Sequence, residues 1–314
     1  MKKPLIILTG PTAVGKTELS IRLAESVNGE IISADSMQVY KHMDVGTAKI
    51  TPEEMQGIRH HLIDILEPSE DFNVYLFKEL AQKAIDEIYE RGKIPVVTGG
   101  TGFYIQALLY NIDFEDTDAD TEFRETMYRL AEEKGNEYVH DMLKEVDPVS
   151  AREIHYNNIK RVVRALEYHN QTGKRISEHN EEQKQNESPY NFLYFVLNDD
   201  RDELYSRINK RVDLMFETGL TKEVDQLIDM GCHRDMTSMK AIGYREFFDY
   251  YDGIADISQV RENIKTDTRH FAKRQLTWFR REKEVTMVNV NEFNRDKDKI
   301  LDYMLKLIRE KEII

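Results

Sequence analysis

The chain has 314 residues, of which 40% are hydrophobic and 32% charged, enough to bury the core of one large domain or two ordinary ones. Its single cysteine, Cys232, excludes an intramolecular disulfide, and no apolar run approaches the roughly 20 residues of a membrane helix. Because the N-terminal residues pass directly into a predicted strand, we expect no signal peptide, a cytoplasmic protein and no membrane partner.

The net charge of −14 is distributed unevenly along the chain. Twelve acidic residues stand against four basic ones between positions 115 and 147, whereas six basic residues outnumber two acidic ones between positions 152 and 175. A second basic cluster occupies positions 273–283. Local basic surfaces of this kind allow contact with a nucleic-acid backbone, although solvated helix faces explain the charge pattern equally well.

The first predicted elements are a strand at residues 5–8 and a helix at residues 18–27, joined by a phosphate loop. The loop consists of Gly10, Pro11, Thr12, Ala13, Val14, Gly15, Lys16 and Thr17, and it fits the pattern G-x-x-x-x-G-K-[ST] in full. This arrangement aims backbone N–H groups and a helix N-terminus at an anion. Lys16 would reach a terminal phosphate and Thr17 would offer its hydroxyl to Mg²⁺. The loop therefore predicts a polyphosphate ligand without saying which one.

The second and third predicted strands, residues 30–33 and 94–97, each lead into residues that suit a ligand site. Asp35 follows the second strand and can hold Mg²⁺ through water or accept a proton, or it simply caps a turn. Thr101 lies in the glycine run after the third strand and offers a hydroxyl, although a tight turn alone would explain the glycines. No acid ends the third strand, which argues against a nucleotide-hydrolysing motor.

Further strands are predicted at residues 192–197 and 285–290, with helices between most of the strands. The alternation indicates an α/β fold, with a P-loop nucleotide-kinase-like core whose parallel sheet is covered on both faces. The alternation breaks in the middle of the chain, where only helices and a loose segment are predicted. These helices are expected at residues 122–134, 137–146, 149–155 and 158–172, and the loose segment at 178–188.

We therefore predict two domains. Residues 1–113 and 190–314 form the P-loop catalytic core, and residues 114–189 form an all-helical insertion domain. The C-terminal part of the core is mainly helical, with helices expected at residues 201–218, 220–230, 238–249 and 257–280.

Two of the C-terminal helices carry residues that suit phosphate or nucleic acid. Arg207 and Arg211 lie four positions apart on one helix face, where they can contact phosphate or pair with nearby acids. Residues 272–280 combine basic residues with Trp278. This pattern is typical of a nucleic-acid surface or of an amphipathic helix that buries the tryptophan. Neither His60-His61 nor Cys232-His233 has metal-ligand spacing.

Together these features resemble the tRNA dimethylallyltransferases, also called tRNA isopentenyltransferases. The matching segments are residues 10–17, 35–40, 46–49, 60–64, 99–104, 160–167, 207–215, 241–244 and 272–280. The most specific are Asp-Ser-x-Gln-Val-Tyr, which begins at Asp35, and Lys-Arg-Gln-x-Thr-Trp, which begins at Lys273. The resemblance is closest to the bacterial form, which has no C-terminal zinc finger.

The resemblance implies transfer of a dimethylallyl group from dimethylallyl diphosphate to the exocyclic N6 amine of adenosine 37, adjacent to the anticodon, in tRNAs that read codons beginning with U. The phosphate loop would hold the diphosphate, not ATP. Asp35 matches the general base proposed for the family, and Thr101 matches a threonine near the reacting centre. Arg207, which the motif does not separate from Arg211, would stabilise the leaving diphosphate. Mg²⁺ is implied as cofactor on Thr17, with Asp35 acting through water, in a monomeric enzyme.

The resemblance also assigns a surface that contacts the tRNA anticodon arm. Its members are Asp35, Ser36, Met37, Gln38 and Thr101 around the base, Phe123, Ile159, Lys160, Arg161, Val162 and Val163 in the insertion, and Lys240, Ala241, Ile242, Gly243, Tyr244, Lys273, Arg274, Gln275, Thr277, Trp278 and Arg280 in the core. Gln38 would offer its amide to an adenine edge. The adenine would leave its stack and enter a channel that meets the diphosphate.

Two other functions fit parts of the sequence. A small-molecule or nucleoside kinase would use the same loop, but would leave the helical insertion and residues 273–280 without a role. A non-enzymatic RNA-binding protein would use the basic surfaces, but would not need Asp35. An assay that offers ATP and dimethylallyl diphosphate together distinguishes a kinase from a dimethylallyltransferase. An Asp35→Ala variant distinguishes the second alternative, because a non-enzymatic RNA-binding protein would keep its function.

Overall fold

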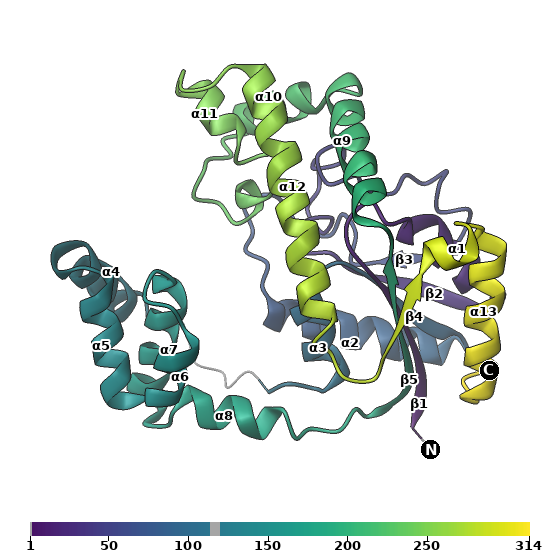
Figure 1. Ribbon diagram of the computed structural model, residues 1–314, viewed down its shortest axis with the longest axis horizontal. Coiled ribbons are helices and arrows are strands. Elements are labelled where there is room, and N and C mark those ends of the chain that lie inside the picture. Colours follow the sequence, from purple (N-terminus) through teal and green to yellow (C-terminus); the bar gives the residue numbers. More distant parts are fainter. Residues whose placement is uncertain (1, 114–119) are drawn as a thin grey trace. The chain divides into compact units, whose positions relative to one another are not determined.

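The computed structural model describes residues 2–113 and 120–314 (Figure 1). The chain divides into two compact units, one formed by Met1–Leu109 with Pro189–Ile314 and the other by Tyr110–Ser188. The domain boundary expected at residue 114 lies outside the described residues. Within those residues, none of the helices combines the length and the apolar character needed to cross a bilayer.

The larger unit is built on a six-stranded sheet in the order β3-β2-β4-β1-β5-β6, in which every pairing is parallel. The strands are β1 (Lys3–Thr9), β2 (Gly29–Ala34), β3 (His60–His61), β4 (Ile94–Gly99), β5 (Tyr190–Asn198) and β6 (Val285–Asn289). The predicted α/β fold with a parallel sheet is confirmed. The sequence analysis missed β3, because a two-residue strand is too short to show an alternating pattern.

Helices cover both faces of this sheet, as Figure 1 shows. Helices α1 (Lys16–Ser26) and α13 (Lys297–Glu310) pack together on one face, where Ile6, Leu8 and Val96 of the strands share an apolar cluster with them. Helices α2 (Val74–Glu90) and α3 (Gly102–Leu109) lie on the other face. Strands buried on both sides read as continuous apolar runs, which is why the sequence reveals them so clearly.

The C-terminal helices of the larger unit are α9 (Arg201–Glu217), α10 (Leu220–Asp229), α11 (Phe247–Tyr251) and α12 (Ile257–Phe279). The continuous helix expected at residues 238–249 was wrong. A 3₁₀ turn at Ser238–Lys240 is followed by turns that lead into α11. Gly243 explains the break, because its φ of 99° lies in the left-handed region, which other residues adopt only with strain.

The smaller unit is helical wherever it has regular structure in the described residues. Its helices are α4 (Thr121–Lys134), α5 (Asn136–Val146), α6 (Pro148–Glu153), α7 (Ile159–Thr172) and α8 (Ile176–Gln183). The loose segment expected at 178–188 was wrong in its first half, because α8 runs to Gln183. Asp147 holds the start of α8, since its carboxylate accepts hydrogen bonds from the backbone N–H and the hydroxyl of Ser177 at 3.0 and 2.7 Å.

Candidate functional site

The carboxyl ends of the four central strands bring the candidate residues to one edge of the sheet. The phosphate loop follows β1, Asp35 follows β2, Thr101 follows β4 and Asp199 follows β5. Ala34 and Gly99 are partners in the sheet register, and the Thr101 N–H donates to the Ala34 carbonyl at 3.1 Å. Asp35 and Thr101 therefore belong to adjacent turns, although 66 positions separate them in the sequence.

The phosphate loop has the backbone conformation that an anion cradle requires. Gly10 and Gly15 have φ of 147° and 104°, which other residues adopt only with strain. A Cβ on Gly10 would lie 2.6 Å from the carbonyl oxygen of Leu197, so only glycine fits beside β5. No side chain caps α1, and the first N–H groups of a helix have no intrahelical acceptor. The loop thus presents amide donors at the positive end of the helix dipole.

Lys16 is held by the phosphate loop in an environment that disfavours its charged form. Its ammonium donates to the carbonyl oxygens of Gly10 and Pro11 at 2.9 and 2.8 Å. Burial and the nearby guanidinium of Arg211 lower the pKa of Lys16 to about 7, although the Asp35 carboxylate opposes this shift. An anion bound here would restore the favourable charge balance, as expected of a diphosphate site.

Asp35 occupies a turn from which its charge acts on Lys16. Its Oδ1 accepts the backbone N–H of Met37 at 2.9 Å and that of Gln38 at 3.3 Å. The side chain is half-buried. The turn-capping role considered from the sequence is therefore present, and the role as proton acceptor or Mg²⁺ ligand stays a prediction for a carboxylate whose charge acts on Lys16.

The two arginines of α9 differ in their partners. Arg207 is paired with Asp199, whose side chain is fully buried and also accepts from Arg295 at 3.1 and 3.2 Å. Burial opposes ionisation of Asp199, but the hydrogen bonds from Arg295, Asp200 N–H and Arg207 keep its pKa below the ordinary value. Arg211 is the arginine whose charge is felt at Lys16. The acids considered as partners from the sequence did not include Asp199.

Helix α12 is fastened to the loops of the site by its inner face. The amide of Gln275 accepts the Thr12 N–H at 2.9 Å and donates to the Gly100 carbonyl at 3.0 Å. The indole of Trp278 covers Gly102, where a Cβ would lie 2.2 Å from the ring. Gln275 is buried, so its side chain holds the phosphate loop and is not presented to solvent.

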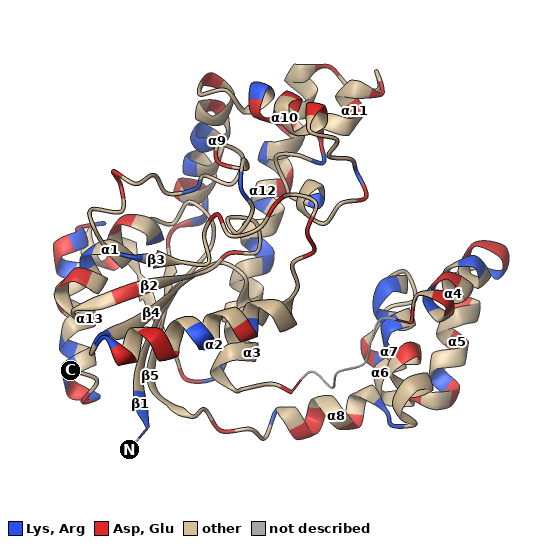
Figure 2. Cartoon of the chain, turned by 180° about the vertical axis from the view of Figure 1, so that it is seen from behind, with Lys and Arg blue, Asp and Glu red and all other residues tan. Residues whose placement is uncertain are grey.

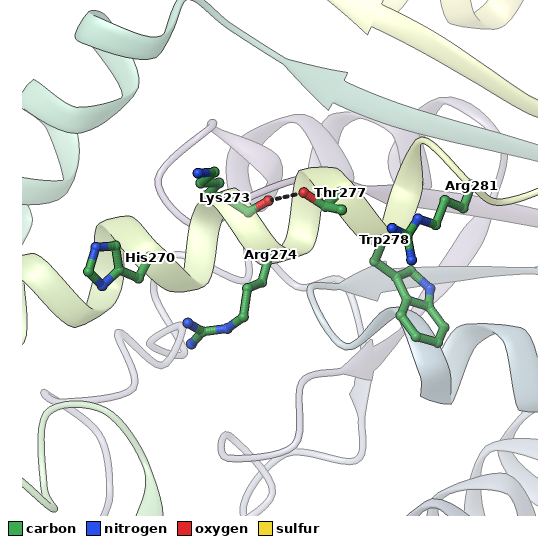
Figure 3. Close-up of a pocket in the computed structure, with 6 residues that line it drawn as sticks. All are labelled: His270, Lys273, Arg274, Thr277, Trp278 and Arg281. Atoms are coloured by element: carbon green, nitrogen blue, oxygen red, sulfur yellow. Dashed lines mark hydrogen bonds between the residues drawn. The ribbon is translucent and has the colours of Figure 1, made fainter. Parts of the chain in front are cut away.

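The outer face of α12 carries a basic pocket of about 390 Å³. Its lining side chains, which Figure 3 shows along one helix and the turn after it, are His270, Lys273, Arg274, Thr277, Trp278 and Arg281. Trp278 is half-buried, as expected for an amphipathic helix that packs its tryptophan inward, and its place on a nucleic-acid surface stays a prediction. One side of the ring packs inward while the pocket reaches the other.

Comparisons with known proteins agree with this geometry. The family model described as IPP transferase matches residues 38–282. The chain belongs to the IPP transferase family. It is 56% identical to a tRNA dimethylallyltransferase of Lachnoclostridium phytofermentans, with 99% of each chain covered.

Solved structures support the same assignment. The tRNA isopentenylpyrophosphate transferase of Bacillus halodurans is 44% identical, with a TM-score of 0.74 over 99% of this chain and 98% of that one. A eukaryotic dimethylallyltransferase described as acting on tRNA is 32% identical, with a TM-score of 0.79 over 91% of this chain and 74% of that one.

The residues expected to contact RNA fall into three classes of exposure in this structure. Lys160, Arg161, Lys240, Lys273, Arg274, Thr277 and Arg280 are exposed, and Figure 2 shows basic residues on α7 and along α12. Val162, Val163, Ala241, Gly243, Tyr244 and Gln275 are buried, so RNA cannot reach these side chains here. Phe123, Ile159 and Ile242 are half-buried, as are Ser36, Met37, Gln38 and Thr101.

The described residues of this IPP transferase contain no group of three or more His, Cys, Asp or Glu side chains able to hold a metal ion. Thr17 is exposed on the loop, and the charge of Asp35 acts on Lys16 of the same loop. These two oxygens suit Mg²⁺ only if the diphosphate and water supply the remaining ligands, which is how Mg²⁺ commonly binds phosphates.

Proposed function

We propose that this protein transfers a dimethylallyl group from dimethylallyl diphosphate to the N6 amine of adenosine 37, adjacent to the anticodon, in tRNAs that read codons beginning with U. The products are N6-(dimethylallyl)adenosine and diphosphate. The observation that carries the proposal is a phosphate loop whose Lys16 ammonium donates to the Gly10 and Pro11 carbonyls and is acted on electrostatically by both the Asp35 carboxylate and the Arg211 guanidinium. The Asp35 carboxylate can take a proton while Lys16 and Arg211 hold a departing diphosphate.

The reaction is a substitution at the first carbon of the dimethylallyl chain. The N6 nitrogen forms a bond to this carbon as the carbon–oxygen bond breaks, and the electron pair of that bond leaves with the diphosphate. One N6 proton passes to the Asp35 carboxylate, which makes the poorly nucleophilic amine reactive. Thr101, in the turn next to that of Asp35, positions the adenine beside the Asp35 carboxylate.

The leaving diphosphate is stabilised by the phosphate loop, residues 10–17, and by the arginines of α9. The loop amides and the α1 N-terminus donate to its oxygens, and Lys16 adds a charge-assisted bond. The charge of Arg211 acts on Lys16, which supports a role for Arg211 at the diphosphate. Arg207 is paired with Asp199, and we propose that it contacts the diphosphate while this pair holds it. Mg²⁺, held by Thr17 and through water by Asp35, would neutralise charge on the diphosphate.

The anticodon arm contacts the exposed basic residues of both units. Lys160 and Arg161 of α7 and the α12 residues Lys273, Arg274 and Arg280 supply phosphate contacts, and the Trp278 pocket accepts a base or ribose face. These contacts would position the RNA while the target adenine leaves its stack, which costs less in a loop than in a duplex. We propose that the enzyme does this as a cytoplasmic monomer.

The test uses the purified protein with an anticodon stem-loop RNA that contains adenosine 37. Dimethylallyl diphosphate and ATP are supplied together, and the nucleosides are analysed by mass spectrometry. The expected result is dimethylallylated adenosine with release of diphosphate and no consumption of ATP. Phosphoryl transfer from ATP with unmodified RNA would instead establish the kinase alternative.

A further inference from the structure

A buried glutamate of α10 holds a loop that the reaction described above does not involve. Glu223 Oε2 accepts the backbone N–H groups of Asp44 and Val45, each at 2.7 Å, and its Oε1 accepts the N–H of Gly46 at 2.9 Å and the hydroxyl of Tyr244 at 2.7 Å. Glu223 as a whole is 8% exposed. No cation in residues 2–113 or 120–314 pairs with it, so these four donors alone balance its charge.

Packing reinforces this loop at the same point. The Tyr244 ring lies against Gly46, where a Cβ would come within 2.5 Å of the ring carbon that carries the hydroxyl. Two positions further on, Ala48 has φ of 48°, a left-handed conformation that costs roughly 1–2 kcal/mol and persists only where its surroundings enforce it. The loop is therefore held in one defined conformation by contacts from α10 and from Tyr244.

The loop in turn fixes the side-chain amide of Gln38. Gln38 Nε2 donates to the carbonyl oxygens of Thr47 and Ala48 at 3.2 and 3.4 Å. Two carbonyl acceptors on that side require the NH₂ group there, because the opposite orientation would set oxygen against oxygen. The Gln38 Oε1 is left as the acceptor that this side chain presents, in the same turn whose backbone N–H groups bind Asp35.

We infer that Glu223 is a positioning residue for base selection: through the loop at residues 44–48 it orients Gln38 so that an amide oxygen, and not an amide NH₂, faces the target base. An acceptor here suits the second N–H of an adenine N6 amine, while the first N–H faces Asp35. A guanine would present its O6 acceptor to the same oxygen and be disfavoured. The inference rests on the proposed function, since it deepens the description of the same site.

The test compares Glu223→Gln with the parent enzyme on stem-loops that carry adenosine or guanosine at position 37. A glutamine has one oxygen, so it must turn an NH₂ group toward at least one of the four donors and release part of the loop. We expect the preference in Kd for adenosine over guanosine to fall roughly tenfold, the value of about one hydrogen bond. The affinity for inorganic diphosphate stays unchanged, which shows that the core remains folded.

A double-mutant cycle separates orientation of Gln38 from a general loss of packing. Gln38→Ala should lose the same base preference, and Glu223→Gln added to it should cost nothing further. Tyr244→Phe, which keeps the three amide bonds to Glu223, should show a smaller loss and serves if Glu223→Gln does not fold. Asp229→Asn, an exposed change on the same helix, is the matched control and should behave like the parent.

The outcomes distinguish the two proposals. Failure of the parent enzyme to alkylate the adenosine stem-loop would refute the proposed function itself. An active parent whose base preference survives Glu223→Gln and Tyr244→Phe would refute the role of Glu223 alone, as would losses that add in the double variant.

Discussion

The two units use charged residues in opposite ways. At the sheet edge of the larger unit, the half-buried Lys16 and the buried Asp199 are held by fixed partners. In the smaller unit, the buried charge of Glu167 only joins helices, because it accepts from Arg124 of α4 and Arg164 of α7, while Lys160 and Arg161 extend into solvent. Bond-making chemistry needs groups held in advance, whereas backbone phosphates are recognised adequately by mobile surface cations.

The contrast is tested most strongly at Asp35. We expect Asp35→Ala to lower the turnover rate by roughly 10²–10⁴-fold, because the N6 proton loses its acceptor. Stem-loop affinity should change little, since the basic surfaces of both units remain. Steady-state kinetics and a filter-binding assay on the same preparation measure both quantities, with Glu25→Ala, an exposed acid on α1, as control. Unchanged turnover would remove Asp35 from the chemistry.

Stability provides the next comparison, between a buried acid of each unit. Glu30 of β2 accepts from Arg91 and His61 at 2.8 Å and pairs with Lys93 at 3.1 Å. Burial alone would raise the pKa of the Glu30 carboxyl, but these hydrogen bonds outweigh it and hold the pKa at about 2. Glu30→Gln should lower the free energy of unfolding at pH 7 by roughly 3 kcal/mol, as expected for a broken buried ion cluster.

The pH dependence of this effect has a defined sign. Because the pKa of Glu30 is lower in the folded state, its contribution is complete above the ordinary value of 4.5 and is lost as the pH falls toward 2. Parent and Glu30→Gln denaturation curves should therefore converge over that range.

In contrast, Glu167→Gln should destabilise the helical unit without changing the diphosphate affinity of the core. A loss of that affinity would contradict the separation of roles between the two units.

Substitution of Lys16 should change the affinity for diphosphate by a free energy similar to or smaller than the stability change expected for Glu30→Gln. Lys16→Met should weaken diphosphate binding by about 10–100-fold, the range of one charge-assisted hydrogen bond. Since the pKa of Lys16 is about 7 without an anion and rises beside one, binding at pH 8 should take up a proton at this side chain. Calorimetry in buffers of different ionisation enthalpy measures this uptake. Equal uptake by parent and variant would assign the proton elsewhere.

The smallest expected effect concerns the exposed cations. Arg161→Ala on α7 should weaken stem-loop binding severalfold at any sequence and reduce the salt dependence of log K by about one phosphate contact. Lys273→Ala on α12 should do the same. Glu132→Ala, on a different helix of the smaller unit, is the comparison variant. A slope that stays constant in both basic variants would place the RNA on another surface.

The sequence predicted what depends on neighbours in the chain and missed what depends on distant partners. The phosphate loop, Asp35 and Thr101 could be placed because apolar strands precede each of them directly. Asp199 was missed although it follows β5, since its partner Arg295 lies 96 positions away. Glu223 was missed for the same reason, as its loop partners lie up to 179 positions away.

Local patterns also failed where the backbone turns between otherwise helical residues. Residues 238–249 have the composition of a helix, but Gly243 adopts a left-handed conformation against Gly46. The start of α8 depends on Asp147, whose carboxylate also caps α6, and no periodicity in residues 178–188 could reveal this contact. Tertiary contacts decided both cases.

The fit of α12 into the glycine turn after β4 limits how either partner can vary. A methyl group on Gly100 would come within 2.2 Å of the Gln275 amide nitrogen, and one on Gly102 would strike the Trp278 ring. Gln275 and Trp278 therefore occupy space that is free only because Gly100 and Gly102 have no side chains. A larger residue at either glycine would require its partner side chain to shift or to be replaced by a smaller one. The side chains allowed in these two short stretches, about 175 residues apart, therefore depend on each other.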